Sequence, residues 1–152
     1  MDARWKPNVT VAAIVEDGGR YLLVEEHTEG GLRLNNPAGH LDPGESLLQA
    51  VAREALEETG RAFTPIWLVG IYLAGTGSGS ADPTYLRFAF AGLASAPVPG
   101  WKLDHGIVRT LWLTPAEIEA SQARHRSPLL WRCVQDHLAG KRYPLELLDN
   151  AA

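Results

Sequence analysis

Apolar and β-branched residues dominate two stretches near the start of the chain, residues 9–15 and 21–25. Such runs predict strands. The Asp-Gly-Gly at 17–19 favours a tight turn, because glycine adopts the positive φ angles that two-residue hairpin turns require. We therefore predict that these two strands pair as a hairpin. Residues 32–36 predict a further short strand or an extended segment.

Three later apolar runs predict strands at 66–73, 85–91 and 108–113. The first two are separated by a glycine- and serine-rich segment at 75–80. Such a segment can cradle phosphate, but the Gly-Lys-Ser/Thr of that motif does not follow it here. We interpret 75–80 as a mobile hairpin loop near the functional site, since loops often carry binding residues.

Two helices are predicted in the last third of the chain. Thr114 as N-cap and Pro115 at the first helical position mark one start, and a second helix is predicted over 128–138, ended by Gly140. Mixed strands with few helices favour an α+β or α/β sandwich. With 152 residues the chain can bury one sizeable core, so we predict a single domain over 1–152.

Composition and charge exclude several classes of protein. The net charge is −4 and no basic cluster resembles a nucleic-acid patch. No apolar run approaches the ~20 residues of a membrane span, and residues 1–6 lack the apolar core of a signal peptide. The single cysteine, Cys133, precludes an internal disulfide and is expected to be a packed core thiol. We therefore expect a cytoplasmic protein, monomeric or weakly dimeric, without nucleic-acid or membrane partners.

A further helix is predicted between two local signals. Ser46 followed by Gln49 matches a capping box, so the helix should begin with Ser46 as its N-cap. The Asp-Pro-Gly at 42–44 forms a turn that cannot extend the helix backwards. Gly60 supplies the left-handed residue that commonly ends a helix.

Three carboxylates gather on one stripe of this helix, those of Glu54, Glu57 and Glu58. The neighbouring stripe is apolar and should face the core: Leu48, Val51, Ala52 and Ala55. Like charges at this spacing repel, and a divalent cation removes the repulsion; clustered oxygen ligands suit Mg²⁺ or Mn²⁺ better than zinc. The alternative is a solvated acidic face on which Arg53 is an incidental partner.

The spacing of fixed residues around this helix favours the metal site. The segment resembles the Nudix box, G-x5-E-x7-R-E-U-x-E-E-x-G-U, which spans 39–61 here. All seven invariant positions match: Gly39, Glu45, Arg53, Glu54, Glu57, Glu58 and Gly60. Two softer positions depart from the pattern, because Ala55 is small and Arg61 is charged where a bulky apolar residue is usual. The resemblance implies an α/β/α sandwich with a central mixed sheet.

The resemblance extends over nearly the whole chain, from about residue 6 to 148. The segments at 6–11, 36–41, 86–88, 126–129 and 141–146 are similar to the NudJ-type branch of that family and keep their order. This similarity implies a phosphatase acting on a thiamine-pathway pyrimidine pyrophosphate, thiamine diphosphate, and nucleoside di- and triphosphates.

By position, the resemblance implies that Glu54, Glu57 and Glu58 bind the metal, with Glu54 and Glu58 the most central. The carbonyl of Ala38 would add a ligand. A metal-activated water would attack phosphorus in line with the leaving phosphate. The base would be a box glutamate or the metal-bound hydroxide itself.

Three more residues are candidates around the metal. The resemblance implies that Glu45 supports the site or occasionally binds the metal. Arg53 would pair with a box carboxylate and fix its orientation. Relatives often supply a distal acid from the loop ahead of a strand that ends in Trp, and Asp104 is the candidate here; the alternative is an ordinary loop aspartate.

Candidate substrate-binding residues are fewer. Arg87 interrupts an otherwise apolar strand, so it either contacts phosphate or lies at a strand edge. His40 directly follows Gly39 and either contacts phosphate or caps the loop. Asn35 and Asn36 could orient this loop or a base.

Two other functions compete with an Mg²⁺-dependent phosphatase. An ADP-ribose or nucleotide-sugar pyrophosphatase would use the same box, but such enzymes tend to carry extra amino-terminal strands, and about seven residues precede the first strand here. A non-catalytic nucleotide sensor of the same fold would usually lose box acids, whereas this chain keeps them all.

Overall fold

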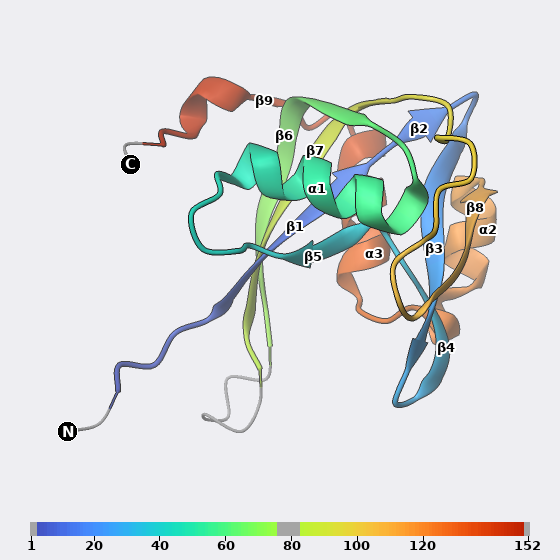
Figure 1. Ribbon diagram of the computed structural model, residues 1–152, viewed down its shortest axis with the longest axis horizontal. Coiled ribbons are helices and arrows are strands. Elements are labelled where there is room, and N and C mark those ends of the chain that lie inside the picture. The colour runs from blue at the N-terminus through green and yellow to red at the C-terminus, as the bar shows by residue number, and fades with distance from the viewer. Residues whose placement is uncertain (1–2, 76–82, 151–152) are drawn as a thin grey trace.

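The computed structural model describes residues 3–75 and 83–150. Its elements form two sheets and three α-helices (Figure 1). One sheet has five strands in the order β5-β1-β7-β6-β9. They span β5 (Ala38–His40), β1 (Asn8–Ile14), β7 (Tyr85–Ala94), β6 (Phe63–Ala74) and β9 (Tyr143–Pro144). The β1–β7 pair is parallel and the other pairs are antiparallel, so the sheet is mixed as predicted.

The second sheet lies at one end of the first. It holds β2 (Glu16–Asp17), β3 (Arg20–Thr28), β4 (Gly31–Asn35) and β8 (Ile107–Leu113), and β3 pairs with each of the others. Two short 3₁₀ turns lie at Gln122–Arg124 and Leu145–Leu147. In Figure 1 the amino terminus extends away below the sheet, opposite the side where β8 lies.

The helices complete the α/β/α sandwich. α1 (Leu47–Thr59) covers one face of the five-stranded sheet, α3 (Leu129–Leu138) covers the other, and α2 (Pro115–Ala120) follows β8 (Figure 1). Side chains of β1 alternate between the two cores, because successive residues of a strand point to opposite faces. Val11 and Ala13 pack under α1, whereas Ala12 and Ile14 pack under α3.

One predicted strand pairing is wrong. Residues 9–15 and 21–25 are strands, but β1 does not pair with β3. Instead β1 lies between β5 and β7, and only the two residues of β2 pair with β3 across Gly18 and Gly19, whose φ angles are 60° and 83°. The turn chemistry was interpreted correctly, yet the chain changes sheets at Val15, just before the turn.

The remaining strand and helix predictions agree with the structure within a few residues. β6 and β7 pair antiparallel as a hairpin. Most of the predicted loop at 75–80 lies outside the described residues. Thr114 caps α2 through a complete capping box with Pro115 at its start, and Gly140 follows α3 with a φ of 79°. Cys133 is fully buried between α3 and the sheet, as expected.

Candidate active site

Helix α1 is delimited by the predicted caps. The Ser46 hydroxyl accepts the Gln49 backbone N–H at 3.1 Å, and the Gln49 side chain accepts the Ser46 N–H at 2.9 Å. Two of the unpaired N–H groups at the helix start are thereby satisfied. Gly60 ends the helix with a φ of 72°. These caps fix where α1 begins and ends, and therefore on which of its turns the acidic residues of the box lie.

The acids of α1 differ in burial. The Glu58 residue is 7% exposed, and the side chains of Glu54 and Glu57 are 12% and 40% exposed. The apolar stripe is rotated slightly from the predicted one, because Ala50 is fully buried whereas Ala52 is only half-buried. This rotation turns Glu58 inward toward β5 and leaves Glu57 at the surface.

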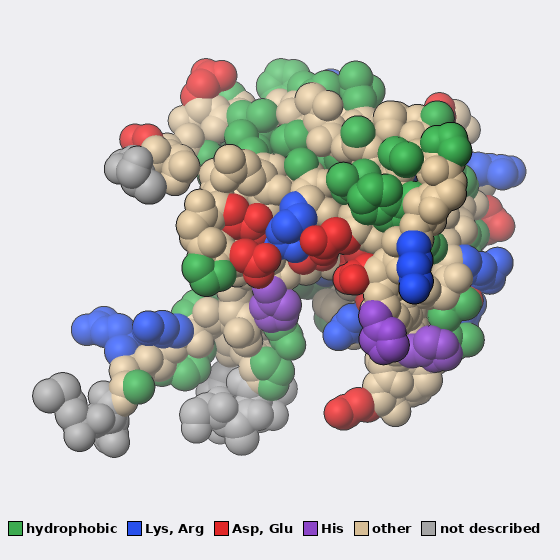
Figure 2. Space-filling view, in the orientation of Figure 1, with side chains coloured by type: hydrophobic (Ala, Val, Ile, Leu, Met, Phe, Trp, Pro, Cys, Tyr) green, Lys and Arg blue, Asp and Glu red, His purple; other side chains and the backbone are tan. Residues whose placement is uncertain are grey.

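Arg53 lies at the centre of the acidic group, and Figure 2 shows acidic side chains gathered around a basic one over α1. Its Nε and Nη2 donate to both carboxylate oxygens of Glu45 at 3.0 and 2.7 Å. Nη1 donates to Glu54 at 2.8 Å and more weakly to Glu57 at 3.3 Å. The hydrogen bond to Glu45 is the main cause that raises the pKa of Arg53. Arg53 therefore ties the loop before α1 to its acids and orients their carboxylates.

Gly39 allows β5 to approach Glu54 closely. A Cβ atom at this position would lie 2.0 Å from the Cδ atom of Glu54, closer than any non-bonded contact allows. A side chain at this position would therefore have to displace the Glu54 carboxylate, and glycine leaves it in place. Gly39 and Glu54 are both invariant positions of the box, and their close approach is a physical reason why the two residues occur together.

Glu58 is a buried acid surrounded by others. Its Oε1 accepts the Ala38 backbone N–H at 2.9 Å. The pKa of Glu58 is raised to about 8; burial is the largest cause, the negative charges of Glu26, Glu54 and Asp104 act in the same direction, and the Ala38 bond opposes them. Burial likewise raises the pKa of Glu54, against the effect of Arg53. Negative charge is therefore concentrated where α1, β3 and the loop before β8 meet.

Asp104 lies beside this group, as the sequence allowed. Its backbone N–H donates to the carbonyl of Glu57 at 2.9 Å, and its charge contributes to the raised pKa of both Glu54 and Glu58. Asp104 itself is exposed. The loop is thus anchored to α1 within electrostatic range of the buried acids.

The donor set fits a hard divalent cation. It consists of carboxylate oxygens, and the burial and acidic neighbours that raise the pKa of Glu58 would be offset by a bound positive charge. Within residues 3–75 and 83–150, no three His, Cys, Asp or Glu side chains stand together at ligand spacing, and Arg53 lies among Glu45, Glu54 and Glu57. In the described residues three of the box carboxylates therefore pair with Arg53 rather than standing at metal-ligand spacing.

A cavity of about 210 Å³ opens on the other side of β5. Arg87 lies in it, buried in β7 between β1 and β6, so the alternative of a strand edge is wrong. Its guanidinium donates to the amide oxygens of Asn36 at 2.8 Å and Asn35 at 3.3 Å. His40 also lines the cavity, with its ring 6.3 Å from that of Tyr85. All of the predicted substrate residues thus meet at or beside one cavity.

Several charged residues of this region were missed by the sequence analysis. Glu26, on β3, accepts a hydrogen bond from Arg126 at 2.7 Å. The neighbouring Glu25 accepts hydrogen bonds from both Arg109 and Arg124. Both glutamates are buried. The one signal in the sequence was a pair of acids inside an apolar strand, and it does not reveal which arginines pair with them.

Arg61 is charged where the Nudix box usually has a bulky apolar residue, and the structure explains this difference. The guanidinium of Arg61 lies over the ring of Trp112, 5.2 Å from its centre, and so replaces an apolar contact with a cation–π contact.

Within the described residues, no helix is long and apolar enough to cross a membrane.

Comparisons with known proteins agree with this geometry. A family model described as the NUDIX domain matches residues 5–132. Phosphatase NudJ of Escherichia coli K12 is 37% identical over 150 residues, which cover 96% of this chain and 93% of that protein. A NUDIX hydrolase from Nitrosomonas europaea is 53% identical with a TM-score of 0.90, over 95% of this chain and 97% of that one.

A more distant structure shares the fold alone. The bifunctional NMN adenylyltransferase/ADP ribose pyrophosphatase from Francisella tularensis, solved with AMP and a manganese ion, has a TM-score of 0.65 and 21% identity. The match covers 91% of this chain and 43% of that one. The family model and the extended identity decide the assignment: this chain belongs to the Nudix family, in its NudJ-type branch, and it is a phosphohydrolase.

Proposed function

We propose that this chain, as a single domain over residues 1–152, is an Mg²⁺-dependent phosphatase of small diphosphate-linked molecules. Its substrates would be a thiamine-pathway pyrimidine pyrophosphate, thiamine diphosphate, and nucleoside di- and triphosphates. The observation that carries the proposal is the buried carboxylate of Glu58, bonded to Ala38 beside a cavity that holds the buried Arg87. Nudix hydrolases generally use a divalent metal such as Mg²⁺, and similarity to Phosphatase NudJ supports the phosphatase activity.

The metal would be held by Glu54, Glu57, Glu58 and the carbonyl of Ala38. When bound, Mg²⁺ neutralises phosphate oxygens and lowers the pKa of water. Glu45 contacts Arg53 on both oxygens, which supports an orienting role more than direct binding. Asp104, exposed and anchored to α1, would be a distal ligand.

The chain's own groups then have separate tasks. Arg53 keeps the carboxylates of the box in register with the loop before α1. One oxygen of Glu58 accepts the Ala38 N–H, which leaves its other oxygen available to bind the metal. Arg87 would bind a phosphate group, with Asn36 orienting its guanidinium and His40 at the edge of the cavity. Because Arg87 is bonded to neutral amide oxygens, its charge stays available for an anion.

Metal dependence provides the first test. Purified protein should lose hydrolysis in EDTA and regain it with added Mg²⁺ or Mn²⁺, followed as released orthophosphate. The substrate panel should include thiamine diphosphate, nucleoside di- and triphosphates, ADP-ribose and a nucleotide sugar. Full turnover in metal-free buffer would refute the metal role. A clear preference for ADP-ribose would identify a pyrophosphatase instead.

The products provide the second test. A NudJ-type phosphatase should release orthophosphate from GTP one group at a time, whereas attack at an inner phosphorus would release pyrophosphate and GMP. Phosphorus NMR of the reaction, with and without added pyrophosphatase, separates these outcomes. Early GDP and orthophosphate would support the proposal. Pyrophosphate as first product would contradict the substrate assignment and leave the metal chemistry intact.

A further inference from the structure

Arg126 lies between the acidic residues around Glu58 and the cavity that contains Arg87. Its Nη1 donates to Oε1 of Glu26 at 2.7 Å, and the same side chain lines the cavity that contains Arg87. It also lines a broad, open hollow at the turn between β3 and β4. The bond to Glu26 is the main cause that raises the pKa of Arg126, and the charge of Glu58 contributes to the same rise. Arg126 therefore stands within electrostatic range of Glu58 while facing the cavity.

The cavity is suited to an anion. Its charged lining residues, within the described chain, are Arg87, Arg126 and the ionisable His40, and none is Asp or Glu. This is unexpected for a chain with a net charge of −4. Strand β5 separates the two environments: Gly39 contacts Glu54 on one side, and the same residue lines the cavity on the other.

We propose that Arg126, oriented by Glu26, binds the phosphate group next to the one that is hydrolysed, and thereby selects substrates with two or more phosphates. The proposal rests on the phosphatase function above and adds a specificity residue to it. Glu26 is then a positioning residue, since it acts only through Arg126.

The donors of Arg126 allow this role. A guanidinium carries five N–H donors, and Glu26 accepts from Nη1, so further donors can reach a phosphate oxygen. The cavity of about 210 Å³ is smaller than the roughly 300–1,000 Å³ of typical ligand pockets, so part of the substrate must extend beyond it. Arg126 borders both the cavity and the open hollow, which places it beside that extension.

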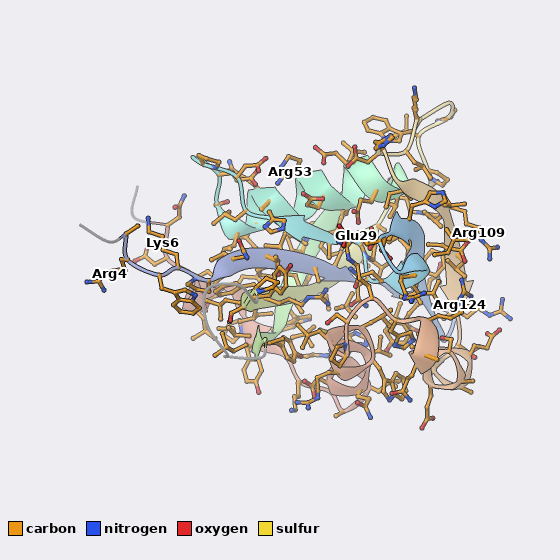
Figure 3. All side chains as sticks on the ribbon, turned by 90° about the horizontal axis from the view of Figure 1, so that it is seen from below. Arg4, Lys6, Glu29, Arg53, Arg109 and Arg124 are labelled. Carbon is orange, nitrogen blue, oxygen red and sulfur yellow. The ribbon has the colours of Figure 1, made fainter. Side chains whose placement is uncertain are left out.

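The chain contains a matched control for this ion pair. Glu25, the residue before Glu26, pairs with Arg124, which lies two residues before Arg126. This ion pair also joins a buried glutamate to a half-exposed arginine. Arg124 does not line the cavity within the described residues. Figure 3 shows Arg124 and Arg109 together at the side of the molecule, away from Arg53 on α1. Removal of Arg124 leaves Glu25 its bond to Arg109, so the fold should tolerate it.

The test is calorimetric binding of methylenediphosphonate, a diphosphate analogue that resists hydrolysis, at low ionic strength in EDTA. Arg126→Ala should weaken binding about tenfold or more, because a charge-assisted bond to phosphate is lost. Arg124→Ala should change it less than about twofold, since Arg124 does not line the cavity. Glu26→Ala keeps the guanidinium but removes the carboxylate that orients it, so it should weaken binding by about threefold, less than Arg126→Ala does.

Two results would overturn the proposal. One is equal binding by wild type and Arg126→Ala. The other is an equal loss in Arg126→Ala and Glu26→Ala with matching falls in melting temperature, which would show that the ion pair is only structural. Because the titration contains neither metal nor turnover, it tests Arg126 independently of whether the named substrates are hydrolysed. With Mg²⁺ present, Arg126→Ala should raise KM for GTP and GDP more than it lowers kcat.

Discussion

The burial of Glu58 leads to a quantitative prediction for Glu58→Gln. This change removes the ionisable group but keeps an oxygen that can accept the Ala38 N–H, the bond that Glu58 makes at 2.9 Å. Activity should fall by at least about a hundredfold, because the carboxylate is expected to hold the metal charge that stabilises the transition state. Metal-free stability should rise, because the variant removes an acid that is disfavoured by burial and by the charges of Glu26, Glu54 and Asp104.

The magnitude follows from the pKa of Glu58. It is raised from 4.5 to about 8 in the folded protein, mainly by burial and further by the neighbouring acids. A tenfold change in proton affinity corresponds to about 1.4 kcal/mol, so the fully charged carboxylate would cost at most about 5 kcal/mol. Structural relaxation and water penetration reduce this cost, and we expect about 1–3 kcal/mol at alkaline pH. An acid whose folded pKa is raised destabilises the fold above its unfolded pKa, so the wild type should lose stability as pH rises from about 5 to about 8.

Urea unfolding in EDTA, followed by tryptophan fluorescence between about pH 5 and about pH 8, measures this difference. The gap in unfolding free energy between Glu58→Gln and wild type should be small at the acidic end and grow with pH. Glu57→Gln is the matched control, because Glu57 is 40% exposed and its removal should change stability by less than about 0.5 kcal/mol. A gap that does not grow with pH, or a less stable Glu58→Gln at pH 8, would refute the reasoning.

Two further variants test the local architecture. Gly39→Ala should displace the Glu54 carboxylate, because the new methyl group would lie 2.0 Å from its Cδ; we expect kcat/KM to fall tenfold or more in steady-state assays, and an unchanged rate would contradict the close approach. Ser46→Ala should cost about 1 kcal/mol in urea unfolding by removing the cap of α1, with kcat at saturating Mg²⁺ within about twofold of wild type, whereas a neutral effect on stability would show that the cap contributes nothing.

The box helix was predictable in detail because its determinants are local. Ser46, Gln49 and Gly60 act within one or two turns of the helix that they delimit, so their spacing alone located α1. Arg53 is also local: its partners Glu54 and Glu57 lie on the same helix, and Glu45 lies one residue ahead of its N-cap. The fold of this segment therefore follows from side chains fewer than ten residues apart.

The incorrect or undecided predictions concern residues whose partners are distant in the sequence. Residues 9–15 have the pattern of a strand, but nothing local records that β1 pairs in parallel with β7, more than 70 residues later. Arg87 could be assigned either to a strand edge or to phosphate, and only the strands on both sides of β7 excluded the edge. The rotation that buries Ala50 rather than Ala52 likewise depends on the surface against which α1 packs.

By itself, the sequence determined the strands and helices, the acidic box with its caps, and through that box the family. Short-range hydrogen bonding, turn chemistry and helical periodicity are encoded within a few residues, so these features need no tertiary context. The tertiary structure alone decided that Glu58 is the buried acid, that Glu26 lies near it, and that Arg87 and Arg126 share a cavity on the other side of β5. Burial, raised pKa values and charge pairing depend on groups brought together through space, and a one-dimensional pattern does not specify those distances.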